Sequence, residues 1–320
     1  MLKLTIVRSF LLALAAALVA VPSPIHADFA AFRAASRIVS LFTLPGEPVS
    51  FDLAGYAGIT PEASARYVVE ASDQVTVLPD GPGRYRLLPG DEVGIHPVVF
   101  RKQVPAGSLA PRPYHVQVVI MRPAGQVIGG NLNGYRLGRY PSEEAGLRWQ
   151  YQKPRGFVEI TAENTHVLLS DHVKLGDLDC KFEAPYPHYA AVHTSLLVKL
   201  ESLVEELNRR GLGGDHLRIM SGYRTPLYNS SIGNQTRFSR HLVGDAADVY
   251  VDRDRDDRMD DMNGDGRTDY RDALCLYRIV DDMDASSGYG PLVGGASAYR
   301  PTEAHGPFVH LDTRGYPARW

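Results

Sequence analysis

The most informative stretch of the chain reads Ser239-Arg-His-Leu-Val-Gly-Asp-Ala-Ala-Asp248, and the run Phe308-Val-His-Leu-Asp312 follows about sixty residues later. Together they offer two imidazoles and one carboxylate, those of His241, Asp248 and His310. Small residues between His241 and Asp248 allow the backbone to turn or to pack closely, so that both side chains can face one point. Three nitrogen and oxygen ligands that leave one position open are what a catalytic zinc site needs. The pattern therefore predicts a zinc site made by His241, Asp248 and His310.

An arginine precedes this string by a short distance. The run Leu217-Arg-Ile-Met-Ser-Gly-Tyr-Arg224 predicts a strand that delivers Tyr223 and Arg224 to its end. Arginine suits forked contacts with a carboxylate or a polarised carbonyl, although a structural ion pair is the alternative. The position just before the His241 string favours a role for Arg224 at the site.

These stretches resemble the zinc D-Ala-D-Ala carboxypeptidase family (LAS-type metallopeptidases), and within it the periplasmic murein endopeptidases. The resemblance covers roughly residues 150–320, about half the chain, and it rests on Ser221-Gly-Tyr-Arg-Thr-Pro-Leu-Tyr-Asn229, the 239–248 string, Phe308-Val-His-Leu-Asp-Thr-Arg-Gly315 and Ala318-Arg-Trp320. It implies His241, Asp248 and His310 as zinc ligands, with water as the fourth. It also implies that Arg224 binds a substrate oxygen and steadies the developing oxyanion.

The general base is where the sequence departs from the family. Several relatives place an acid three residues before the last ligand, or a histidine two before it, whereas this chain has Pro307 and Phe308 there. Among nearby titratable groups, His305 is the residue we expect to act as general acid and base. Asp312 shares a strand face with His310, so we expect its carboxylate to orient that imidazole from outside the ligand set.

Aspartates are dense between residues 252 and 284, an insertion within the catalytic half. The run 261–272 fits the calcium-loop template, with Gly266 at the sharp turn and oxygen ligands expected from Asp261, Asn263, Asp265, Arg267 (through its carbonyl), Asp269 and Asp272. A helix over Ala273–Met283 is expected to follow. The upstream run Asp252-Arg-Asp-Arg-Asp256 is a degenerate second loop, a complement to the first, or a solvated acidic face. The role of calcium here would be structural.

Composition sets the class and compartment. The chain has 320 residues, 44% hydrophobic and 22% charged, with a net charge of −3, so two globular domains are expected and nucleic acid is an unlikely partner. Residues 1–27 have the charged start, short apolar run and small residues of a secretory signal, with an uncleaved anchor as the alternative. We expect export across the inner membrane to the periplasm and no transmembrane span in the mature protein.

The expected domains are a β-rich unit over 28–145 and a peptidase domain over 146–320. Short strand-like runs between turn formers predict a small β-sandwich, either a structural spacer or a wall-binding module. The peptidase domain is expected to be α+β, with a small antiparallel sheet, flanking helices and a first long helix over His188–Arg210. The chain's two cysteines, Cys180 and Cys275, form one bridge or remain two thiols.

The sequence thus predicts an exported zinc metallopeptidase that hydrolyses peptide bonds in peptidoglycan stems or cross-links. The murein endopeptidase resemblance favours cross-link cleavage over removal of a terminal D-alanine. A non-catalytic cell-wall binding module that contains zinc and calcium is the main alternative, and a calcium-controlled scaffold is a third. The oligomeric state stays open.

Overall fold

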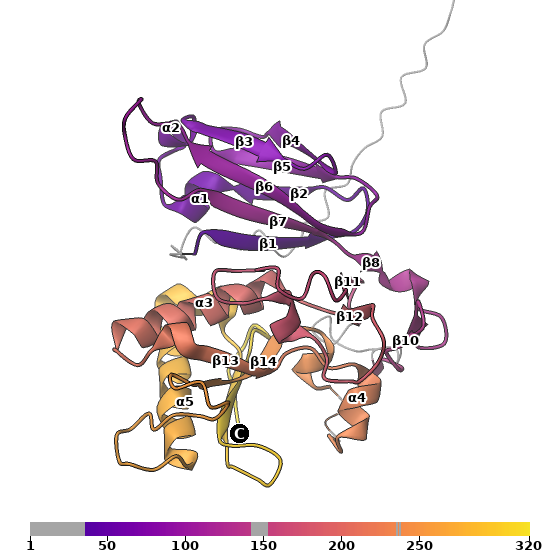
Figure 1. Ribbon diagram of the computed structural model, residues 1–320, viewed down its shortest axis with the longest axis vertical. Coiled ribbons are helices and arrows are strands. Elements are labelled where there is room, and N and C mark those ends of the chain that lie inside the picture. The colour runs from indigo at the N-terminus through magenta and orange to yellow at the C-terminus, as the bar shows by residue number, and fades with distance from the viewer. Residues whose placement is uncertain (1–35, 142–152, 235, 237) are drawn as a thin grey trace, which may run out of the picture.

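The computed structural model describes residues 36–141, 153–234, 236 and 238–320, so the predicted signal segment lies outside the described residues. Figure 1 shows a β-sandwich stacked on a larger α+β unit. Each part has its own hydrophobic core. None of the described helices combines the length and apolar composition that crossing a bilayer requires.

The N-terminal unit consists of two packed sheets. Its sheets have the orders β1-β7-β6-β3 and β2-β5-β4, made by β1 (Ile38–Thr43), β2 (Val49–Asp52), β3 (Tyr67–Ala71), β4 (Val75–Pro79), β5 (Arg84–Pro89), β6 (Gly94–Lys102) and β7 (Tyr114–Ile120). The short helices α1 (Leu53–Ala57) and α2 (Pro61–Ser64) follow β2. All pairs are antiparallel except β1 with β7. The three-stranded sheet packed against the four-stranded sheet β1-β7-β6-β3 has an immunoglobulin-like sandwich topology.

A connecting region leads from the sandwich into the second unit. It holds β8 (Arg122–Pro123), η3 (Ala124–Gln126), the β9–β10 pair (Asn131–Leu132 and Tyr135–Arg136), β11 (Gly156–Ile160) and β12 (His188–Ala190). Leu132, Tyr135 and Leu137 pack into the larger core. These three residues fall within the 28–145 range expected for the N-terminal domain, and their side chains belong to the core of the C-terminal unit.

The C-terminal unit is built on a five-stranded sheet of order β13-β14-β16-β15-β17. Its strands are β13 (Leu217–Ser221), β14 (Ala246–Val251), β15 (Gly295–Tyr299), β16 (Phe308–Asp312) and β17 (Ala318–Arg319), antiparallel except for the β15–β17 pair. The helical segments are η6 (Leu175–Leu178), α3 (Thr194–Arg209), η7 (Gly214–His216), α4 (Pro226–Ser231), η8 (Arg240–Leu242), α5 (Tyr270–Ala285) and η9 (Ser287–Leu292).

Side-chain alternation divides this sheet into two faces. Val249 on β14, and Val309 and Leu311 on β16, are fully buried in the core shared with α3 and α5. Because successive side chains point to opposite faces, Asp248 and His310 project from the other face. The sheet thus presents one apolar face to the helices and one face that carries the predicted ligands.

Two helices begin at residues other than those expected, and the structure shows which of the two alternatives for the cysteines holds. The first long helix begins at Thr194 rather than His188, because His188–Ala190 pairs with β11 as a strand. The later helix begins at Tyr270, where Asp269 caps its N-terminus and accepts from the Arg271 N–H. Cys180 and Cys275 are two separate thiols.

The sandwich contacts the C-terminal unit through β1 and β7. The fully buried Ser40 on β1 donates from Oγ to the Leu169 carbonyl at 2.7 Å, and its own carbonyl accepts from Thr194 Oγ1 at 2.8 Å. The Arg37 N–H donates to Asp171 Oδ2 at 2.8 Å, and Gln117 Nε2 to the Leu168 carbonyl at 3.3 Å. Segment 168–171 is therefore held by the sandwich.

Candidate active site

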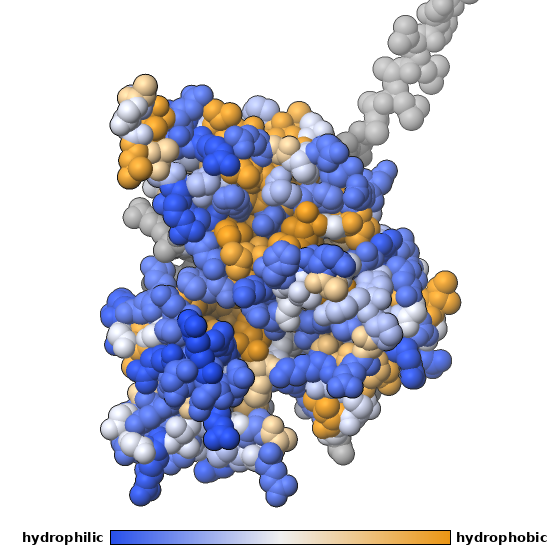
Figure 2. All heavy atoms as spheres, viewed as in Figure 1, coloured by the Kyte–Doolittle hydropathy of each residue, from blue (hydrophilic) through white to orange (hydrophobic). Residues whose placement is uncertain are grey.

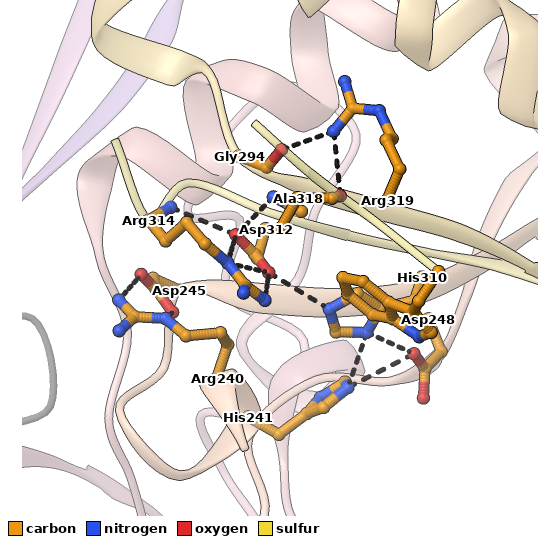
Figure 3. Close-up of polar contacts among 12 residues, drawn as sticks. Arg240, His241, Asp245, Asp248, Gly294, His310, Asp312, Arg314, Ala318 and Arg319 are labelled. Carbon is orange, nitrogen blue, oxygen red and sulfur yellow. Dashed lines mark hydrogen bonds and ion pairs between the residues drawn. The ribbon is translucent and has the colours of Figure 1, made fainter. Parts of the chain in front are cut away.

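Adjacent strands bring the three predicted ligands together. Asp248 on β14 pairs directly with His310 on β16, and His241 lies in η8 just before β14. Asp248 Oδ1 lies 3.2 Å from His241 Nε2 and 3.0 Å from His310 Nδ1, and the two nitrogens are 3.1 Å apart. Figure 3 shows the three side chains converging on one point. All three are buried.

This donor set fits a zinc ion. Ligand atoms about 2.0–2.1 Å from a tetrahedral zinc lie about 3.3 Å from one another, close to the sides of the observed triangle. His241 Nδ1 lies 2.6 Å from the Gly222 carbonyl and must donate to it, which leaves Nε2 without a proton. His310 Nε2 lies 3.3 Å from Asp312 Oδ2, so donation there leaves Nδ1 bare in the same way. Two lone pairs and a carboxylate oxygen then face one point, which a cation satisfies.

Without a metal, the three groups share protons instead. Burial lowers the pKa of His241. Burial also disfavours the charged form of His310, but hydrogen bonds to Asp248 and Asp312 outweigh it and raise the pKa of His310 to about 9. Burial acts to raise the pKa of Asp248, yet contacts with the two imidazoles hold that pKa well below its ordinary value. Zinc would therefore displace a proton from this group of side chains.

The carboxylate of Asp312 joins His310 to the end of the chain. It accepts from the Gly295 N–H at 2.7 Å and from Arg314 Nε at 2.9 Å (Figure 3). Arg314 in turn lies 5.3 Å from the ring of Trp320, and the Trp320 and His310 rings are 5.4 Å apart. A buried, charge-paired acceptor thus fixes the orientation of the His310 imidazole.

The turn between His241 and Asp248 is fixed by packing and by an ion pair. Gly244 has a φ of +82°, and a Cβ there would lie 2.2 Å from the Ala191 carbonyl oxygen. The Gly244 carbonyl accepts from the His193 N–H at 3.0 Å. The buried Arg240 guanidinium pairs with Asp245 across the same turn. These contacts explain why the turn needs glycine and small residues.

Arg224 lies beside the ligand set. Its guanidinium pairs with Asp248, on the oxygen Oδ2 that does not face the imidazoles, and donates from Nε to Ser221 Oγ at 2.8 Å. Its backbone N–H donates to the His241 carbonyl at 3.2 Å. Arg224 therefore positions a predicted ligand, in addition to any contact with substrate.

A groove of about 710 Å³ lies along the same sheet, and its lining does not include His241, Asp248 or His310. It runs between β13 and the segment 168–181, and its lining includes Tyr250, two residues beyond Asp248 on the same face, and Pro307 just before β16. Figure 2 shows a hollow with an apolar floor at the place that β13 and β14 occupy in Figure 1. The volume is within the range of small-ligand sites.

His305, the expected general acid and base, lines this groove. Its Nδ1 lies 2.8 Å from the Gly306 carbonyl, and its ring packs edge-on against Phe308 at 4.9 Å. Donation from Nδ1 leaves Nε2 able to accept a proton. Among the described residues, no carboxylate other than Asp248 and Asp312 contacts the two ligand imidazoles.

The predicted calcium loop is folded around backbone amides. Asp261 accepts from the N–H groups of Gly264, Asp265 and Gly266. The fully buried Asp272 accepts from Met262 and Asp269, so it closes the loop onto α5. The remaining predicted ligands Asn263, Asp265 and Arg267 are linked by bonds from Asp265 N to Asn263 Oδ1 and from Arg267 N to Asp265 Oδ1. In the described part of the insertion, the carboxylates that lie close enough to share a cation are those of Asp252, Asp254 and Asp260.

A comparison with protein families supports a peptidase in the C-terminal half of the chain. Residues 178–270 match the model of a family described as Peptidase M15, which confirms the resemblance of the C-terminal half to the zinc D-Ala-D-Ala carboxypeptidases and supports a peptidase. The matched segment contains Arg224, His241 and Asp248. No curated protein matches the chain. A solved structure titled "Solution Structure of Amebosin" matches with 14% identity over 25% of this chain and 87% of that chain, at a TM-score of 0.15, which is too low to support a shared fold.

Several contacts at the site were missed by sequence reasoning. Ser221, Gly222 and Arg314 contact the ligands or their partners, and Trp320 lies beside His310. The spacing of Arg314, two residues after Asp312, was a possible signal. The position of Trp320 beside His310 depends on the pairing of β17 with β15. The run Ala318-Arg-Trp320 is part of the family resemblance, but the resemblance gives Trp320 no role.

Proposed function

We propose that the protein is an exported zinc metallopeptidase that hydrolyses peptide bonds of peptidoglycan, with cross-links favoured over terminal D-alanine. The observation that carries the proposal is the triangle of His241, Asp248 and His310, whose three ligand atoms face one point. The match to the Peptidase M15 family supports it. The volume of the groove, about 710 Å³, supports cleavage within a chain, since removal of a terminal residue needs only a small, closed site.

A zinc ion held there supplies Lewis-acid chemistry and makes a bound water acidic enough to react near neutral pH. The protein's own residues hold the predicted ligands in place and polarise the scissile carbonyl group. Arg224 keeps Asp248 in place and presents N–H groups where negative charge develops on the scissile carbonyl oxygen. Asp312 holds the imidazole of His310. His305, with Nε2 available, is the proposed proton carrier between water and the leaving amine.

A second candidate is a non-catalytic cell-wall binding module. The observation in its favour is that, in the part of the chain that the structure describes, no uncommitted carboxylate lies against the ligand imidazoles. Asp248 is itself a predicted ligand, and Asp312 is occupied by Arg314. The three-residue ligand set favours the peptidase, because a purely structural zinc site has four protein ligands.

The test is digestion of purified cross-linked peptidoglycan, with the released muropeptides identified by mass spectrometry. The zinc-loaded protein should convert cross-linked dimers to monomers, and the product masses identify the bond. His310→Ala should abolish the conversion, and the matched control His166→Ala, at an exposed histidine away from the site, should retain it. Unchanged dimers that still bind the protein would favour the binding module.

Two further parts of the proposal rest on the sequence pattern. Export follows from the signal-like residues 1–27, and fractionation of cells would locate the processed chain. A structural calcium ion in the 261–272 loop is supported by the loop's spacing and by Gly266 at a φ of +80°. Aspartates of the upstream 252–260 run are an alternative location for the cation.

A further inference from the structure

Strand β13 is at the edge of the five-stranded sheet. It pairs with β14 on one side, and the sheet order places no strand on the other. The groove of about 710 Å³ lies along this outer side. An edge strand with open backbone groups can accept another extended chain.

The register shows which peptide groups of β13 face outward. The His216 carbonyl accepts from the Asp252 N–H at 3.0 Å, so His216 directs its carbonyl toward β14. Because bonding alternates along an antiparallel pair, Arg218 also bonds toward β14, while Leu217 and Ile219 point their N–H and C=O groups away. The irregularity in register comes after Ile219 and does not alter this alternation.

The Leu217 N–H donates to the Gly214 carbonyl. Among the described residues, the outward Leu217 carbonyl and the outward N–H and carbonyl of Ile219 have no backbone partner. Beyond the strand, the edge is covered, since the Tyr223 N–H donates to the Leu178 carbonyl at 3.1 Å. The open stretch therefore ends where the ligand region begins. It is continuous with Ser221, which contacts Arg224, and with Tyr250, two residues from Asp248.

The opposite wall of the groove is the segment 168–181, which carries charges of both signs. It contributes Lys174 and Lys181, and also Asp171 and Asp177, to the lining. Nearby Asp177 is already used as an acceptor of the Lys174 N–H. An extended peptide in the groove would satisfy the open backbone groups of β13.

We propose that the substrate peptide binds as an added strand along the outer edge of β13, with the N–H and carbonyl of Ile219 and the carbonyl of Leu217 as its backbone partners. This inference rests on the proposed peptidase function. The peptide lies between β13 and the segment 168–181 and reaches the ligands at the C-terminal end of β13. Substrate selection then depends on an extended backbone conformation of the peptide.

The first experiment removes one backbone donor. Ile219→Pro deletes the outward N–H while the bonds to β14 remain, and Ile219→Ala keeps that N–H and measures the effect of shortening the side chain. With soluble cross-linked muropeptide dimers as substrate, Ile219→Pro should reduce kcat/KM by roughly tenfold, mainly through KM, and by clearly more than Ile219→Ala. Equal losses in the two variants would overturn the strand-addition proposal.

The second experiment uses the unmodified sequence and does not depend on turnover. Amide hydrogen exchange is measured by mass spectrometry on the zinc-free full chain, with and without the same muropeptide dimer. Slower exchange over 217–221 supports the proposal, and unchanged exchange there overturns it. If the dimer is cleaved but the 217–221 amides are not protected, the strand-addition proposal is wrong and the peptidase proposal stands. If these amides are protected but the zinc-loaded protein does not cleave the dimer, the peptidase proposal is wrong and strand addition stands.

Discussion

Replacement of Asp312 by asparagine tests how strongly the site depends on the residue behind His310. The Asp312 carboxylate is fully buried and accepts from His310, Gly295 and Arg314. Asparagine keeps the shape but removes the negative charge that Arg314 neutralises. Breaking a buried ion pair costs about 3–5 kcal/mol. Because Arg314 can turn partly toward solvent, we expect the free energy of unfolding to fall by about 3 kcal/mol.

The same change should weaken zinc binding in a pH-dependent way. Loss of a carboxylate partner behind a ligand histidine costs about 10–100-fold in metal affinity. In the metal-free protein the pKa of His310 is raised to about 9, so below pH 9 zinc must displace a proton, and affinity should rise with pH up to that value. Asp312→Asn removes one cause of the raised pKa. The variant's affinity should therefore level off at a lower pH, and its deficit should be largest near pH 9.

The assay is competition with a chromogenic chelator in zinc buffers from pH 7 to pH 9.5, together with urea unfolding of the metal-free proteins. Asp281→Asn is the matched control, since it makes the same chemical change at a half-exposed carboxylate that pairs with Arg319. A zinc affinity within twofold of the unmodified protein at every pH would refute the role assigned to Asp312.

Three further predictions concern the turn, a surface ion pair and the acidic insertion. Gly244→Ala should lose roughly 3 kcal/mol of unfolding free energy in urea, because it combines a left-handed φ with overlap of the Ala191 carbonyl; a loss under about 1 kcal/mol would contradict this. Hydrogen bonds from Arg209 and then Arg210 lower the pKa of Glu206 to about 2, so its contribution is present above its ordinary pKa and disappears as pH falls toward 2. Glu206→Gln should therefore cost about 0.5–1 kcal/mol at pH 7 and close to nothing near pH 2, since these pairs are partly solvated. Calcium at about 100 times its Kd should raise the Tm by roughly 5–10 °C, and Asp265→Asn should reduce that shift while Asp254→Asn should not; the reverse result would move the ion to the upstream run.

The predicted ligand set depended on short-range and alternating patterns, which a sequence displays. His241 and Asp248 lie within one turn, and Asp312 shares a strand face with His310 by simple alternation. Side-chain roles that depend on sheet order could not be predicted in this way. The open edge of β13 exists because β14, β16, β15 and β17 all lie on its other side, an order that no residue in β13 encodes.

Helix boundaries show a related limit. The apolar period that predicts the first long helix continues back to His188, but Val158 to Ile160 in β11 supply strand partners for His188–Ala190. Long-range pairing thus overrides the local period at the start of that helix, whereas at its end Arg209 agrees with the expected boundary to within one residue. The N-terminus of α5 was also displaced, because the Asp269 cap extends the helix into the predicted loop.

The contacts of the sandwich bear on what this unit contributes to function. A tethered wall-binding module would need few fixed contacts, but Ser40, Arg37 and Gln117 all hold the segment 168–171, and Leu168 and Asp171 of that segment line the groove. The sandwich therefore holds a segment that forms part of the groove wall.

Ser40→Ala tests whether the sandwich shapes the groove or has only a structural or targeting role. It leaves the buried Leu169 carbonyl without its donor, at a cost of about 1–3 kcal/mol, and should let the segment shift away from β13. If the sandwich shapes the groove, KM for muropeptide dimers rises while kcat and zinc affinity stay near those of the unmodified protein. Ser50→Ala, at an exposed position on β2, is the control for an effect of the sandwich's surface alone. If Ser40→Ala loses stability as expected but keeps its KM, the segment 168–171 holds its position without the Ser40–Leu169 hydrogen bond. The sandwich would then have only a structural or targeting role.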